Sequence, residues 1–135
     1  MNWKLILGLS LVGLAMGLAT VFWIPSNVEP FVWLVIFVFS AIVIAKRCGS
    51  RPFVHGLLVS LANSVWITGA HVLLFDQYLA HHPQEASMMQ AMARPDLARE
   101  MMAVLGPVIG GISGVVLGFF SLIAFKLAER KRLTS

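Results

Sequence analysis

Residues Leu105 to Phe125 read LGPVIGGISGVVLGFFSLIAF, an apolar stretch long enough to cross a bilayer as one helix. Glycine occupies every fourth position from 106 to 118. On a helix of 3.6 residues per turn these glycines advance by about 40° per step, so they form one slowly winding groove. Helices in lipid associate through close packing, which small residues permit. The stretch therefore predicts a packing site that we call the glycine ladder: Gly106, Gly110, Gly114 and Gly118.

The composition places the chain in a membrane. Of its 135 residues, 59% are apolar and only 12% are charged, and the mean hydropathy is +0.86. A soluble domain carries roughly 25% charged residues. The net charge of +4 does not indicate nucleic-acid binding, because the basic residues stand at the ends of apolar runs and form no stripe. Cys48 is the only cysteine, which excludes an intramolecular disulfide.

The sequence predicts an all-α membrane protein with one domain over residues 1–135. Prolines and polar caps separate the apolar runs, and the opening run is as long as a span, which disfavours a secretory signal peptide. A short amphipathic helical segment is expected between the third and fourth helices, with one helix before Pro95 and another after it. Pro107 should kink the entry to the fourth span or mark its first turn. The predicted spans cover about 4–24, 28–45, 52–79 and 105–128, and the outer amphipathic loop covers 80–104.

The first span carries a smaller seam of small residues, including Gly13 and Gly17, which we interpret as packing inside the bundle. The glycine ladder leaves two possibilities open. It either joins subunits or packs the fourth helix onto the first or third helix of the same chain.

Lysine and arginine indicate the orientation. Lys4, the loop 46–51 and the C-terminal cluster 126–132 fall on one side, whereas the turn 25–30 has no Lys or Arg. By the positive-inside rule, both termini should be cytoplasmic. Because this bias in Lys and Arg holds at every loop, insertion of the chain in both orientations, a dual topology, is disfavoured.

The third span carries most of the polar side chains found within the spans. Polar groups are costly against lipid tails, so this face should meet the bundle interior, a partner subunit or water. A lone histidine there could relay protons along a pathway, or it could be a structural residue bonded to a neighbouring helix. The candidate pathway residues are Ser60, Asn63, Ser64, Thr68 and His71.

A second group of interest lies on the outer loop. Imidazole and thioether groups could bind copper(I), but methionines on an amphipathic loop more often form an apolar face, and the spacing matches no metal motif. We therefore predict no metal and no cofactor. The low-probability metal residues are His81, His82, Met88, Met89 and Met92.

Catalysis finds little support in the sequence. His71 and Asp76 are five residues apart and project about 140° from each other on a helix, so they cannot complete a triad. No zincin, nucleophile-elbow or phosphate-loop motif is present.

We therefore expect a non-enzymatic integral membrane protein that self-associates, or binds a partner membrane protein, through the helix of the glycine ladder. The alternative is a small channel or transporter with a pathway lined by the polar face of the third helix. The expected partners are membrane lipid and either a second copy of the chain or another membrane protein, and no nucleic acid.

The C-terminal half shows a family resemblance. It has Tyr78 and a His-Pro pair at the end of one span, a Met-rich amphipathic loop, and a Gly-rich span that ends in SLIAFKLAERKR at residues 121–132. This pattern resembles uncharacterised four-span bacterial membrane proteins of the DUF4199 type. The resemblance implies four spans and a bacterial inner membrane, and it transfers no function and no site residue.

Overall fold

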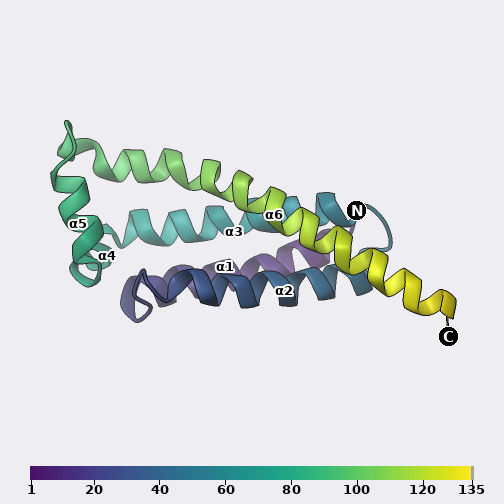
Figure 1. The fold of residues 1–135 in the computed structure, drawn as a ribbon. Coiled ribbons are helices and arrows are strands. Elements are labelled where there is room, and N and C mark those ends of the chain that lie inside the picture. Colours follow the sequence, from purple (N-terminus) through teal and green to yellow (C-terminus); the bar gives the residue numbers. More distant parts are fainter. Residues whose placement is uncertain (135) are drawn as a thin grey trace.

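The computed structural model describes residues 1–134, which contain four helices long and apolar enough to cross a membrane. These helices alternate in direction along the bundle (Figure 1). The predicted fold class, an all-α membrane protein with four spans, is therefore confirmed. The spans are α1 (Trp3–Phe22), α2 (Glu29–Arg47), α3 (Pro52–Leu73) and α6 (Ala98–Thr134).

The helix ends follow local sequence signals. The side chain of Asn2 caps α1, because its Oδ1 accepts a hydrogen bond from the backbone N–H of Leu5 at 3.1 Å. Pro30 and Pro52 occupy the first turns of α2 and α3, where a missing N–H costs nothing. Gly49 takes a left-handed backbone conformation (φ 69°) in the tight connection between α2 and α3.

The third helix is shorter than the predicted span of 52–79. It ends at Leu73, Leu74 leaves the helical conformation at φ −107° and ψ 35°, and a separate helix α4 (Phe75–His81) follows. A straight helix over that range would be about 40 Å long, longer than the hydrocarbon core of about 30 Å. The break instead turns α4 across the end of the bundle, where the carboxylate of Asp76 is exposed.

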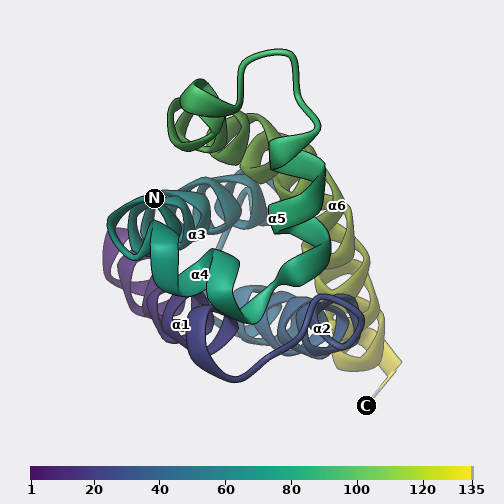
Figure 2. The same cartoon turned by 90° about the vertical axis from the view of Figure 1, so that its left-hand side faces the viewer.

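The outer loop 80–104 contains α5 (Pro83–Gln90) and the 3₁₀ turn η1 (Pro95–Leu97), which leads directly into α6. Figure 2 shows α4 and α5 crossing in front of the spans, and we call this the cap end. The fourth helix is longer than the predicted 105–128, with 37 residues and a length of about 55 Å. Pro107 lies inside α6 and not in its first turn; the helix continues past it and bends along its length (Figure 1).

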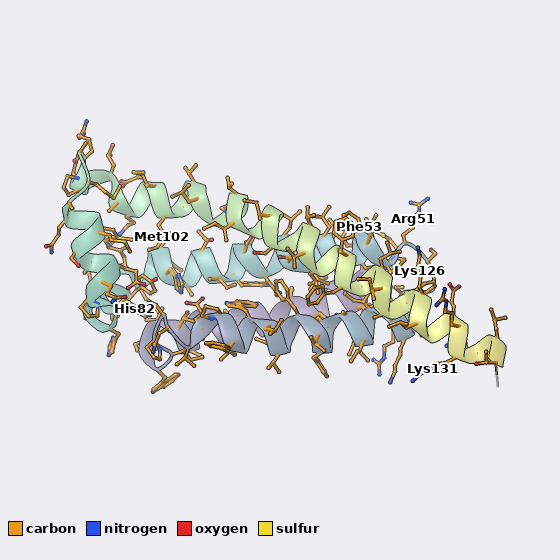
Figure 3. All side chains as sticks on the ribbon, in the orientation of Figure 1. Arg51, Phe53, His82, Met102, Lys126 and Lys131 are labelled. Carbon is orange, nitrogen blue, oxygen red and sulfur yellow. The ribbon has the colours of Figure 1, made fainter. Side chains whose placement is uncertain are left out.

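The opposite end of the bundle carries both chain termini and the connection between α2 and α3. Arg51, Lys126 and Lys131 lie at this end, whereas His82 and Met102 lie toward the cap end (Figure 3). We call the end that carries the two termini the basic end.

α3 is the central helix, because it packs on α1 along one side and on α6 along the other. α2 packs mainly on α6 and touches α1 only slightly. Glycine makes both contacts of α3 close. A Cβ atom at Gly13 of α1 would lie 2.7 Å from the Cα of Asn63, and one at Gly56 would lie 2.8 Å from the Cα of Gly118. Real Cβ atoms do not approach a backbone that closely, so only glycine fits at these points.

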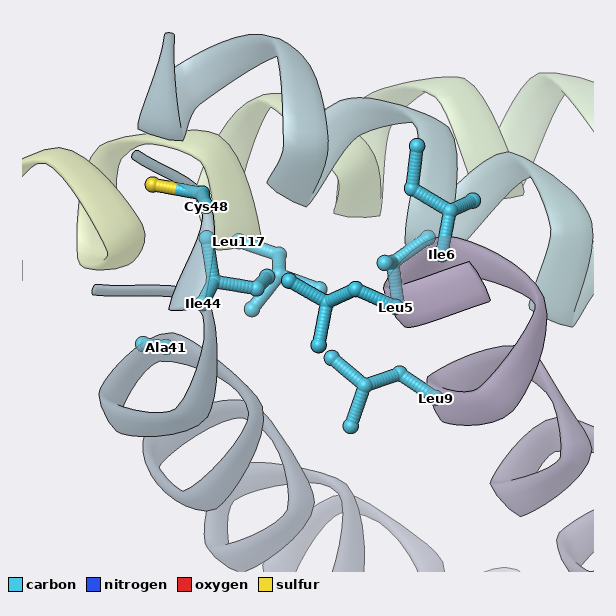
Figure 4. Packing of buried hydrophobic residues seen from close by; sticks show 8 residues of the cluster. Leu5, Ile6, Leu9, Ala41, Ile44, Cys48 and Leu117 are labelled. Carbon is cyan, nitrogen blue, oxygen red and sulfur yellow. The ribbon is translucent and has the colours of Figure 1, made fainter. Parts of the chain in front are cut away.

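Apolar side chains from all four spans fill the interior toward the basic end (Figure 4). Ile6, Ile44, Val59 and Leu117 are each at most 2% exposed. We call this cluster the apolar plug, and its other members are Leu5, Leu9, Ala41 and Cys48.

We expect Gly56→Ala to destabilise the bundle by about 1–3 kcal/mol, the usual cost of overpacking, because the new methyl group meets the backbone of α6. Gly69→Ala on the same helix is the matched control, since nothing lies within 4 Å of its Cβ position. Thermal unfolding in detergent, followed by tryptophan fluorescence, measures both variants. Equal melting temperatures for Gly56→Ala and the parent protein would contradict the close approach of α3 and α6.

Candidate functional site

A cavity of about 720 Å³ lies between α2, α3 and α6, in the half of the bundle next to the cap end. Its volume is within the usual range for ligand pockets. One wall is polar and consists of the five predicted pathway residues: Ser60, Asn63, Ser64, Thr68 and His71. The facing walls are largely apolar and include Leu34, Phe37, Met102, Leu105 and Ile109. The structure thus joins the polar face of α3 to apolar faces of α2 and α6 in one amphipathic space.

The polar wall offers hydrogen-bond acceptors. The hydroxyl of Ser60 donates to the carbonyl of Gly110 at 3.0 Å, and that of Ser64 donates to the carbonyl of Leu61 at 2.8 Å. Their hydroxyl protons are therefore already used, and the oxygen lone pairs remain. Asn63 is only 3% exposed, and its Oδ1 has no hydrogen-bond partner among residues 1–134. That oxygen lies against Gly13 of α1, and the amide N–H groups of Asn63 and the hydroxyl of Thr68 add donors to the wall.

His71 stands at the cap end of the polar wall and is held by α1. Its Nε2 lies 2.7 Å from the hydroxyl oxygen of Thr20, and that hydroxyl is also 2.9 Å from the carbonyl oxygen of Met16. A hydroxyl donates once, so the tautomer of His71 decides whether the Thr20 proton goes to the imidazole or to the carbonyl. His71 is thus bonded to a neighbouring helix and lines the cavity as well. Thr20 is not among the candidate site residues that the sequence predicts.

Three aromatic rings stack across the break between α3 and α4. The ring of Tyr78 lies 4.3 Å from that of His71 and 4.2 Å from that of His82, measured between centroids. His82 is 2% exposed, with Nδ1 at 2.9 Å from the Tyr78 carbonyl oxygen and Nε2 without a partner in the described chain. The turn at Leu74 folds Tyr78 back over His71, which a continuous helix would not do.

Acidic residues border the cavity at the cap end. Glu29 lines it, and its Oε1 accepts a hydrogen bond from the indole N–H of Trp33 at 3.1 Å. Ser26 also lines it and donates a hydrogen bond to Glu85 of α5. Glu29 is not among the candidate site residues that the sequence predicts. The four-residue spacing of Glu29 and Trp33 was the available signal, because it places the two side chains on one face of α2.

The glycine ladder faces α3 of the same chain. Cβ atoms added at its four positions would meet, in order, Thr68, Ser64, Leu57 and Phe53. In α1, Gly13 faces Asn63 and Gly17 faces Ala70 and Ile67. Because α3 fills the groove, a partner helix reaches the ladder only by displacing α3. Self-association through the ladder stays a prediction.

The outer histidines and methionines are not brought together. His81 and Met88 are exposed, whereas His82 is buried in the aromatic stack. Met89 and Met92 line the cavity. Residues 1–134 contain no group of three or more His, Cys, Asp or Glu side chains that could hold a metal ion.

No family model, curated protein or solved structure matches this chain. Its resemblance to the DUF4199 type therefore stays a prediction.

Tyr78 provides a pH test of the cap end. Burial, and after it the negative charges of Glu85 and Glu29, raise the pKa of Tyr78 from 10.0 to about 12. Because the folded protein favours the neutral phenol, its contribution to stability is complete below pH about 10 and is lost as the pH rises toward 12.

Tyr78 is the only tyrosine, so tyrosinate absorbance reports it alone. We expect its ionisation midpoint near pH 12. Glu85→Gln should lower that midpoint, whereas Glu129→Gln at the basic end should leave it unchanged. A midpoint at the ordinary pKa would contradict the burial of Tyr78 between the two histidines.

Proposed function

We propose that this protein is a small, non-catalytic membrane protein that binds an amphiphilic solute in the cavity, as a carrier does. The observation that carries the proposal is the pairing of one polar wall with apolar walls in a single space of about 720 Å³. A purely apolar solute would leave the acceptors of α3 unsatisfied, which is costly in a membrane. A strongly polar solute would gain no favourable contact from the apolar walls of α2 and α6.

The apolar plug supports a closed binding site and not an open pore. On α2, α3 and α6, the first residue of the plug lies about one helical turn or less from the last residue of the cavity. The last cavity residue and the adjoining plug residue are Phe37 and Ala41 on α2, Ser60 and Val59 on α3, and Ser113 and Leu117 on α6. The cavity is therefore closed toward the basic end. Passage of a solute through the protein would require the plug to open, which is the behaviour of a carrier.

The apolar walls support entry from the bilayer. Leu34, Leu105 and Ile109 line the cavity and are nevertheless 53%, 49% and 60% exposed. Such residues border an opening between α2 and α6 that faces the lipid. An amphiphile already dissolved in the bilayer has direct access through it.

The orientation is a further part of the proposal. Arg51, Lys126 and Lys131 lie at the basic end (Figure 3), so the positive-inside rule supports a cytoplasmic basic end and a cavity that opens toward the outer half of the membrane. A bacterial inner membrane is supported by the family resemblance alone.

Filling the cavity should abolish solute binding. Ser113→Trp places a large side chain in the cavity, and we expect it to weaken retention of amphiphiles at least about tenfold, which corresponds to 1.4 kcal/mol. Ile112→Trp is the matched control, because Ile112 is 65% exposed on the outer face of the same helix. Native mass spectrometry of protein released from nanodiscs counts bound amphiphile per chain and also gives the number of subunits. Equal retention in the two variants would contradict the proposal.

The orientation is tested by cysteine labelling of intact bacterial spheroplasts. In a Cys48→Ser background, a membrane-impermeant maleimide should label Gln90→Cys at the end of α5 and should not label Lys131→Cys near the C-terminus. Permeabilised cells should show labelling of both. The reverse pattern in intact spheroplasts would overturn the proposed orientation.

A further inference from the structure

The cavity has an uncompensated negative charge. Among the residues that line it, Glu29 is the one carboxylate, and the described lining includes no lysine or arginine. Glu85 stands directly behind the rim, bonded to Ser26. Within residues 1–134 the ion pairs are Arg94 with Asp96 and Arg99 with Asp76, so neither glutamate has a basic partner.

Aromatic rings stand beside this charge. Trp33 donates its indole N–H to Glu29, which fixes the ring next to the carboxylate. Tyr78 also lines the cavity. Indole and phenol faces attract cations, most strongly where water is excluded. A carboxylate and aromatic faces together form a receptor for an organic ammonium group.

The remaining walls suit the rest of such a molecule. The lone pairs of Ser60 and Ser64 accept hydrogen bonds from N–H donors, and the carboxylate of Glu29 repels a carboxylate or phosphate in the same space. Met101 and Met102 contribute flexible, polarisable side chains that adapt to hydrocarbon of varied shape. The cavity therefore disfavours anions and accepts a tail of variable structure.

We propose that the cavity binds an amphiphilic organic cation, with its ammonium group at the Glu29 carboxylate and against the face of Trp33, and its hydrocarbon tail against α2 and α6. This inference rests on the proposed function and specifies the chemical class of its solute. The cation supplies the counter-charge that Glu29 lacks.

The test compares three probes with one tail: dodecylammonium, dodecanol and dodecanoate. Each is added to the full-length protein in phosphatidylcholine nanodiscs, and bound probe per chain is measured by native mass spectrometry. We expect dodecylammonium to be retained at least about tenfold better than dodecanol, the preference that one buried charge-assisted contact supplies. Dodecanoate should be retained least.

Glu29→Gln should remove this preference for the cation, because glutamine keeps an acceptor for Trp33 and loses only the charge. Glu100→Gln, on the exposed first turn of α6, is the control and should keep the preference. Trp33→Phe should weaken retention of the cation more than that of dodecanol, because the smaller ring attracts a cation less well. Since Glu29 is kept, this variant tests the aromatic contribution separately from the charge. Thermal unfolding checks that each variant is folded.

The outcomes separate the two proposals. Retention of dodecanol and dodecylammonium to the same extent, or an unchanged preference in folded Glu29→Gln, would overturn the cation site while leaving solute binding intact. Retention of none of the three probes would overturn the proposed function as well.

Discussion

The close approach of α3 to both α1 and α6 is the constraint on which the rest of the structure depends. Lipid gives helices little reason to associate, so contact must come from backbones that meet without intervening side chains. Gly13 and Gly56 allow α3 to do this on two sides. The polar residues of α3 are thereby shielded from hydrocarbon, where each would be costly. One helix therefore serves both as the scaffold of the bundle and as the polar wall of its cavity.

The cavity exists because α2 does not take part in this close packing. Its body is bulky and β-branched and contains no glycine, and it packs on α6 where the plug fills the interior. Its contact with α3 is slight. Figure 1 shows the resulting divergence of α2 and α6, and Figure 2 shows α5 across the end. Tight packing of three helices and loose packing of the fourth thus produce a closed half and a hollow half.

Most of the fold could be predicted because span length, proline position and glycine spacing are properties of local sequence. The polar face of α3 was predictable for the same reason, since helical periodicity alone gathers Ser60, Ser64 and His71. The break at Leu74 was not, because no proline or glycine marks it and it depends on packing of Tyr78 over His71. The contributions of Thr20, Glu29 and Glu85 were also beyond local reasoning. Each comes from a different helix, and only the assembled bundle brings them to the same region.

The interleaved packing of the spans has a consequence for biosynthesis. α1 and α2 are neighbours in sequence but scarcely touch, since α1 packs on α3 and α2 on α6. The hairpin of α1 and α2, which emerges first from the ribosome, therefore has few internal contacts. The polar wall of α3 stays open to lipid until the last span has inserted. A chain truncated before α6 exposes Ser60, Ser64 and Thr68 to the bilayer, which is the kind of feature by which quality-control proteases of membranes distinguish unfinished proteins from finished ones.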